Sequence, residues 1–184
     1  MKKVILFFAN GTEEVEALTA VDLLRRAGAD VTLAGVGGLT VTGSHGIRIT
    51  ADIDAKDMDA FDGFDMVVIP GGLPGTNHLD ESPAVDKALK TVHMAGGYLA
   101  AICAAPLVLG KRGYLQNKKA VCYPGFESYL TGAVKPCDGT RVCTDGKIIT
   151  GAGAGVATDF ALALIAALYG NEKADEICRA ILAD

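Results

Sequence analysis

Tryptophan is absent from the 184 residues of this chain, and only three residues are histidine. His45, His78 and His93 all precede Cys103, and residue 104 is alanine. A cysteine hydrolase needs a general base in contact with its sulfur. We expect His93 inside a helix beside a sheet, and His45 in a hairpin at a surface or an interface. His78 reaches the sulfur only if its loop folds back. The sequence therefore does not support a cysteine peptidase or amidase.

Long apolar runs and runs of basic residues are also missing. No stretch approaches the roughly 20 apolar residues of a membrane helix, and the net charge is −5. These features argue against a membrane surface or a nucleic acid as partner. The short apolar run Val4–Ala9 is interrupted at once by Asn10 and Gly11, so we interpret it as a first strand and not as a signal peptide.

Closely spaced cysteine pairs are absent too. The five cysteines, at positions 103, 122, 137, 143 and 178, form no C-x-x-C motif and have no histidine at metal-ligand spacing. We therefore expect neither a metal nor a cofactor. An odd number of cysteines without a signal sequence favours reduced thiols in a cytoplasmic protein.

Apolar runs alternate with amphipathic segments along the chain, which is typical of an α/β fold with a mostly parallel sheet covered by helices on both faces. We expect one domain, residues 1–184. The predicted strands are Val4–Ala9, Val31–Val36, Met66–Ile69, Tyr98–Ile102 and Ala120–Tyr123, with hairpins at Val41–Thr50 and Arg141–Thr150. The predicted helices are Glu14–Ala27, Pro83–Ala95, Ala105–Lys111, Val156–Tyr169 and Glu172–Leu182.

The first predicted helix has a helical apolar period that ends at Gly28. This pattern predicts inward-facing side chains at Val15, Leu18, Val21 and Leu24. It predicts outward-facing side chains at Glu14, Arg25 and Arg26.

Cys103 ends the apolar run 98–102, and small residues and Pro106 follow it. A strand that turns sharply into a helix projects the residue at its corner, and Ala101 and Ala105 leave room for such a turn. This pattern predicts a nucleophile elbow with cysteine in place of serine. The nearby helix N-terminus favours the thiolate form. The alternative is a cysteine that only packs in the core.

Two further loops follow strand ends and therefore meet Cys103 at the carboxyl edge of a parallel sheet. In the first loop, Glu16 lies among apolar positions, so we expect it to point inward, with a raised pKa, and to hydrogen-bond the thiolate or move a proton. We interpret Glu13 and Glu14 as acids that complement the helix dipole. In the second loop, Gly71 and Gly72 suit an oxyanion hole, although a plain turn explains them as well.

The glycine-rich stretch 151–155 does not match a dinucleotide-binding motif. Val156 or Thr158 stands where the third glycine of G-x-G-x-x-G belongs, and the stretch does not follow the first strand. We interpret it as a close-packed entry to a helix near the site.

Four segments together resemble the DJ-1/ThiJ/PfpI superfamily, and within it the branch of DJ-1 and the bacterial ThiJ-like proteins. They are residues 9–16 (ANGTEEVE), 67–72 (VVIPGG), 100–106 (AAICAAP) and the glycine-rich stretch before Asp159. The resemblance covers nearly the whole chain in the same order. It implies a flavodoxin-like three-layer sandwich and a cytoplasmic homodimer.

The resemblance also implies roles for individual residues. Cys103 corresponds to the nucleophile and redox sensor, Glu16 to its partner, and Gly72 and Ala104 to the N–H donors of the oxyanion hole. Tyr123 stands where related proteins often carry a histidine. Asn10, beside the first loop, is a candidate pocket residue.

Two functions and one inert alternative follow from these residues. The first is an enzyme that acts on reactive 2-oxoaldehydes or on their adducts, of the glutathione-independent glyoxalase or deglycase type, with Cys103 as nucleophile and Glu16 as proton carrier. The second is a redox-sensing stress protein or chaperone that works through oxidation of Cys103. A binding module with an inert cysteine is the third reading.

Overall fold

Seven strands of the described residues form one sheet in a computed structural model that describes residues 1–135 and 139–183. The strand order is β5-β2-β1-β6-β7-β9-β8. The strands are β1 Lys3–Ala9, β2 Asp30–Val36, β5 Ile53–Asp54, β6 Met66–Ile69, β7 Tyr98–Ile102, β8 Val142–Asp145 and β9 Ile148–Gly151. All pairs are parallel except β8 with β9, which confirms the predicted mostly parallel sheet. Cys137 lies outside the described residues.

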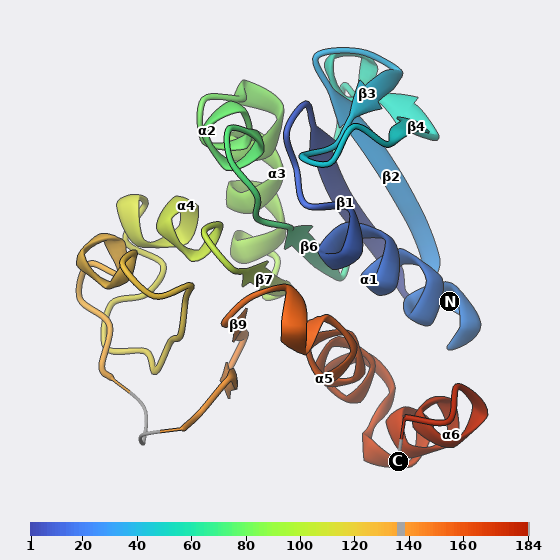
Figure 1. Cartoon of the computed structure of the whole chain (residues 1–184), viewed down its shortest axis with the longest axis vertical. Helices are drawn as coiled ribbons and strands as arrows, with labels where there is room; N and C mark the ends of the chain where they lie inside the picture. The colour runs from blue at the N-terminus through green and yellow to red at the C-terminus, as the bar shows by residue number, and fades with distance from the viewer. Residues whose placement is uncertain (136–138, 184) are drawn as a thin grey trace.

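Helices cover both faces of this sheet (Figure 1). On one face lie α1 Glu14–Arg26, α5 Ala157–Tyr169 and α6 Asn171–Ala180, and on the other lie α2 Gly75–Asp80, α3 Pro83–Met94 and α4 Pro106–Lys111. Alternate residues of β1 enter the two apolar cores: Leu6 packs on the α1 side and Phe7 on the α3 side. The predicted three-layer sandwich is therefore confirmed.

Shorter elements complete the described part of the chain. The hairpin of β3 Thr40–Thr42 and β4 Arg48–Thr50 is antiparallel, as predicted. Three 3-10 turns lie at Ala55–Asp57, Glu127–Tyr129 and Ala154–Val156. No helix among the described residues is both long and apolar enough to cross a lipid bilayer.

The orientation of α1 differs from the prediction. Val21 and Leu24 are buried, as expected, but Val15 and Leu18 are 52% and 38% exposed, and Glu14 is only 3% exposed. The face against the sheet is Ala17, Ala20, Val21 and Leu24, which follows the i, i+3, i+4, i+7 spacing of one helical stripe. Two of these four buried residues are alanines, so the larger apolar side chains of Val15 and Leu18 do not mark the buried face of the helix.

The predicted strand Ala120–Tyr123 is wrong. Its backbone donors go elsewhere: Val121 N–H donates to the Thr150 hydroxyl at 3.0 Å and Tyr123 N–H to the Cys103 carbonyl at 2.8 Å. Among the residues that the structure describes, only an isolated bridge, between Lys119 and Val134, is found beside this segment. The segment therefore runs as extended chain that supports the Cys103 turn. The short helix α2 and strand β5 were not predicted.

Candidate active site

Cys103 lies at the corner between β7 and α4, where the sequence places it. Its φ is +65°, in the left-handed region that side chains other than glycine rarely adopt. Its N–H donates to the Gly151 carbonyl at 2.9 Å, and its carbonyl accepts from Tyr123 N–H at 2.8 Å. The side chain is half-buried and unpaired with another cysteine. The corner therefore fixes the backbone on both sides of a half-buried side chain.

Glu16 points inward from the first turn of α1, as the sequence predicts, and is 1% exposed. Its Oε2 accepts a 2.8 Å hydrogen bond from Gly71 N–H. Its Oε1 is buried and has no hydrogen-bond partner in the described part of the chain. A buried carboxylate oxygen without a donor is costly, whereas a protonated Oε1 has a hydrogen to give. The site therefore suits a carboxyl group that holds a proton.

The carboxyl of Glu16 and the thiol of Cys103 lie close enough to shift each other's pKa. Burial raises the pKa of Glu16 to about 7, against the opposing hydrogen bond from Gly71. Burial is the largest cause that raises the pKa of Cys103, and the facing Glu16 carboxylate is the second. Together they raise it to about 12. The prediction of a lowered thiol pKa at the helix N-terminus is therefore wrong, because burial and Glu16 outweigh the nearby N–H groups. Between about pH 7 and about pH 12 the pair therefore holds one proton.

Two N–H groups face the sulfur. The backbone N–H groups of Gly72 and Ala104 hydrogen-bond Cys103 and oppose the rise in its pKa. Gly72 has a φ of +84°, which glycine adopts without strain. At Gly71 an added Cβ would lie 2.6 Å from the Cβ of Cys103 and 2.9 Å from Glu16 Oε2. These glycines let the loop after β6 approach both side chains closely.

Two other predicted pocket residues lie at the edge of this group. Tyr123 supports Cys103 through its backbone, and its side chain is 51% exposed. An added Cβ at Gly153 would lie 3.2 Å from the Tyr123 ring, so the glycine-rich stretch does adjoin this residue. The side chain of Asn10 binds the hairpin, because its Oδ1 accepts a 2.8 Å hydrogen bond from Thr42 N–H. It ties the first loop to the β3–β4 hairpin.

The hydrogen bonds, ion pairs and ring contacts of the three histidines involve residues other than Cys103 and Glu16. His93 packs edge-on against Tyr114 with ring centroids 4.8 Å apart, and His78 Nδ1 lies 2.9 Å from the Asn10 carbonyl oxygen. His45 is in the hairpin, and its side chain is 71% exposed.

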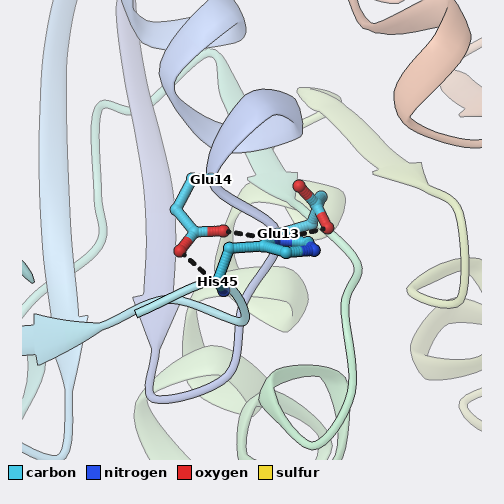
Figure 2. Close-up of side chains that lie close together, drawn as sticks. All are labelled: Glu13, Glu14 and His45. Atoms are coloured by element: carbon cyan, nitrogen blue, oxygen red, sulfur yellow. Dashed lines mark hydrogen bonds and ion pairs between the residues drawn. The ribbon is translucent and has the colours of Figure 1, made fainter. Parts of the chain in front are cut away.

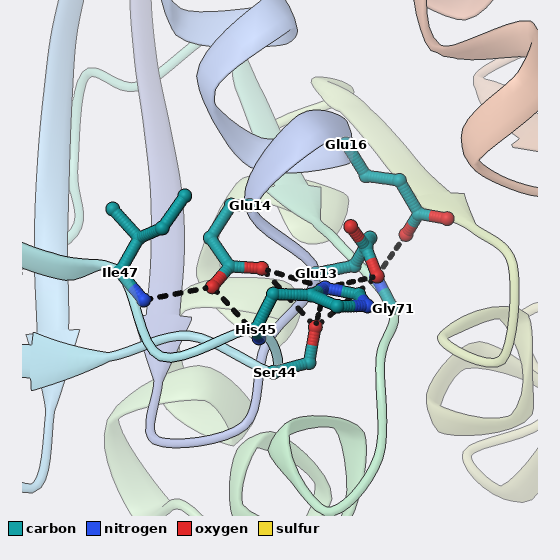
Figure 3. A network of polar contacts seen from close by, with 7 residues as sticks. All are labelled: Glu13, Glu14, Glu16, Ser44, His45, Ile47 and Gly71. Carbon is teal, nitrogen blue, oxygen red and sulfur yellow. Dashed lines mark hydrogen bonds and ion pairs between the residues drawn. The ribbon is translucent and has the colours of Figure 1, made fainter.

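A polar cluster that the sequence did not reveal joins the start of α1 to the hairpin (Figure 2). Glu13, Glu14 and His45 offer ligand atoms within 4.8 Å of one another. Figure 3 shows Ser44 among them and Glu16 bound to Gly71 nearby. About 30 residues separate the two segments in sequence, so no local spacing signals their contact.

Glu14 is an acid in the first turn of α1, as predicted, but the prediction that it faces outward is wrong, since it is 3% exposed. Its carboxylate accepts from His45 N–H at 2.9 Å and from Ile47 N–H at 3.3 Å. Burial alone would raise the pKa of Glu14, but these and the other hydrogen bonds outweigh it and hold the pKa at about 2. Glu14 is therefore a buried anion that anchors the hairpin.

Comparison with known proteins is consistent with this geometry. A model of the DJ-1/PfpI family matches residues 2–167. The chain belongs to the DJ-1/PfpI family. The resemblance found in the four sequence segments is thereby confirmed.

Members of this family with similar length and fold are known from several organisms. The chain is 41% identical over 182 residues to "Protein dj-1beta" of Drosophila melanogaster, covering 98% of this chain and 97% of that protein. It is 35% identical over 175 residues to "Glutathione-independent glyoxalase DJR-1.2" of Caenorhabditis elegans, covering 95% and 92%. The solved structure "Toxoplasma gondii DJ-1, oxidized" has a TM-score of 0.93 at 38% identity, covering 99% and 98%.

Proposed function

We propose that this DJ-1/PfpI family member converts reactive 2-oxoaldehydes such as methylglyoxal, free or as adducts of amines and thiols, into 2-hydroxy acids without glutathione. The observation that carries the proposal is the half-buried Cys103 sulfur facing the buried carboxyl of Glu16. The relative named as a glutathione-independent glyoxalase supports the same reaction class.

The reaction begins with the proton that the pair shares. When the proton lies on Glu16, Cys103 is a thiolate, and its lone pair adds to the aldehyde carbon of the substrate. The carbonyl π electrons move to oxygen, which takes the proton from Glu16 and gives a hemithioacetal. The N–H groups of Gly72 and Ala104 stabilise the oxygen while it is negative.

Glu16 then moves a second proton. The carboxylate removes the hydrogen from the former aldehyde carbon and returns it to the neighbouring carbon, while the hemithioacetal hydroxyl gives its proton to the ketone oxygen and becomes the thioester carbonyl. The first carbon is oxidised and the second is reduced, so no external oxidant is required. Water cleaves the resulting thioester, which releases the 2-hydroxy acid and restores the thiol. A carboxyl with a pKa of about 7 suits both donation and removal of a proton near neutral pH.

Lactate formation from methylglyoxal in the absence of glutathione tests this proposal. We expect Cys103→Ser to abolish turnover and Glu16→Gln to lose most of it, by at least about 100-fold. Cys178→Ser is the matched control, since Cys178 lies on α6 away from the described site. Undiminished activity in Cys103→Ser would overturn the mechanism.

Oxidation of Cys103 is the second candidate function. A half-buried thiol beside a proton-donating carboxyl suits a redox sensor, because two equivalents of peroxide oxidise it to a sulfinate that Glu16 can hydrogen-bond. A related solved structure is described as oxidised. Mass spectrometry after mild peroxide, run beside the lactate assay, separates the two functions. Two oxygens gained at Cys103 without dicarbonyl turnover favour the sensor, and oxidation spread over all cysteines contradicts it.

We also propose that the chain acts as a cytoplasmic homodimer. Val15 and Leu18 lie one turn apart on α1 and are exposed, and Ile47 beside the buried Glu14 is 53% exposed. Exposed apolar side chains that cluster on one face favour an interface. The four described cysteines are unpaired, which agrees with a reducing compartment.

A further inference from the structure

The polar cluster between α1 and the hairpin contains four donor atoms of mixed chemistry. They are Oε2 of Glu13, Oε2 of Glu14, the Ser44 hydroxyl and Nδ1 of His45. Two come from the start of α1 and two from the β3–β4 turn (Figure 3). This set is distinct from Cys103 and Glu16, which the proposed reaction uses.

The Ser44 hydroxyl and His45 Nδ1 each lie close to both carboxylate oxygens. The Ser44 hydroxyl lies 3.1 Å from each carboxylate oxygen and 3.0 Å from His45 Nδ1. His45 Nδ1 lies 3.2 Å from the Glu14 oxygen and 3.5 Å from the Glu13 oxygen. One ligand atom each of Glu13, Glu14 and His45 lies within 4.8 Å of the other two, a spacing at which the three residues could hold one metal ion.

The charge of the cluster also favours a cation. Among the described residues, Glu13 and Glu14 both form an ion pair with His45. Two neighbouring carboxylates repel each other unless a positive charge lies between them. Ser44 and His45 are exposed, so an ion can reach the cluster from solvent.

We propose that Glu13, Glu14 and His45, assisted by Ser44, bind a divalent transition-metal ion of the zinc class. An imidazole nitrogen with carboxylate oxygens suits zinc better than magnesium or calcium, which prefer oxygen ligands alone. His45 binds through the Nδ1 lone pair, so its ring proton lies on Nε2 in the bound form. The exposed position predicts reversible binding.

Calorimetric titration of the full chain with zinc chloride tests the proposal. We expect one zinc per chain at this cluster, and His45→Ala and Glu13→Gln each weaken it at least about tenfold. Both residues have solvent-facing side chains in part, so these variants keep the fold even if Glu14→Gln does not. His78→Ala is the matched control, because His78 is an exposed histidine outside the cluster.

A thiol could bind zinc independently, so Cys103→Ser belongs in the same experiment. Binding retained in Cys103→Ser and in His78→Ala, but weakened in His45→Ala and Glu13→Gln, supports the site. Equal affinity of His45→Ala and wild type overturns it. Loss of all binding in Cys103→Ser also overturns it, since the metal then belongs to the sulfur. This test does not depend on the proposed dicarbonyl reaction, which can fail while the metal site holds.

Discussion

The backbone N–H of Gly71 donates a 2.8 Å hydrogen bond to Oε2 of Glu16. This bond fixes the carboxyl group from the loop after β6, while the glutamate itself comes from α1. The other oxygen, Oε1, is left without a hydrogen-bond partner in the described residues. The backbone thus holds this carboxyl group through Oε2, which leaves Oε1 for the proton exchange with Cys103 that we propose.

Stability should depend on pH through Glu16. Its pKa is raised from 4.5 to about 7 in the folded chain, so the folded state holds the proton more tightly than the unfolded state. The resulting stability is fully present below pH 4.5 and is lost as pH rises through about 7, with a difference of about 3 kcal/mol. Urea unfolding at pH 5 and pH 8 should show a smaller pH difference for Glu16→Gln than for wild type.

The control for this measurement is Glu81→Gln, an exposed carboxyl outside the site. It should keep the pH dependence of the wild type. If Glu16→Gln and wild type lose the same stability between the two pH values, Glu16 is not the titrating group. A chelator in all buffers keeps metal binding at the neighbouring cluster out of the comparison.

The alkylation rate of Cys103 should follow two ionisations. The pair of Cys103 and Glu16 first loses one proton near pH 7, and from then on a fraction of the Cys103 side chains is thiolate. The remaining proton leaves near pH 12. Glu16→Gln should lose the step near pH 7 and show one ionisation below 12, because the repelling carboxylate is gone. Iodoacetamide labelling across pH, read by mass spectrometry, measures both curves. A step near pH 7 that persists in Glu16→Gln would assign it to another group.

Gly71→Ala should damage the site by a steric effect alone. The added Cβ would lie 2.6 Å from the Cβ of Cys103 and 2.9 Å from the Ile102 carbonyl oxygen, which is backbone and cannot move aside cheaply. We expect a loss of about 1–3 kcal/mol in stability and a fall in Cys103 alkylation. Gly155→Ala is the control, since its Cβ would meet only the flexible end of Arg141, at 3.1 Å. Equal effects of both variants would contradict this packing.

Replacing Val15 and Leu18 with glutamine should dissociate the proposed dimer. Both side chains are exposed in one chain, so the change leaves its core intact while it removes apolar area from the interface. Sedimentation velocity should show a dimer for wild type and a monomer for the double variant. Met94→Gln, at a residue that is 76% exposed on α3, should leave the dimer unchanged. A monomeric wild type would refute the proposal directly.

The sequence predicted the parts of the structure that depend on local pattern. Buried parallel strands such as Val4–Ala9 appear as continuous apolar runs, and the corner at Cys103 follows from small residues and Pro106. Glu16 could be placed inside because its neighbours are apolar. Each of these patterns is formed by residues that are close together in the sequence, so a single sequence is enough to predict them.

Contacts between distant segments could not be predicted in the same way. Glu14 is buried only because the hairpin N–H groups of His45 and Ile47 meet it. The segment 120–123 has the composition of a strand, but Cys103 and Thr150 take its N–H groups. The pKa of Cys103 likewise depends on a glutamate 87 positions earlier in the chain, and the helix N-terminus alone predicts the wrong direction.

The peptide groups on both sides of Cys103 are hydrogen-bonded, to Gly151 and to Tyr123. Fixing one residue's backbone costs about 1–2 kcal/mol of conformational entropy, and here that cost is met when the chain folds. A reacting molecule therefore meets a sulfur whose direction of approach is already set. If the proposed reaction holds, selectivity among small carbonyl compounds follows from which of them can present their carbon along that one direction, and not from adjustment of the protein around them.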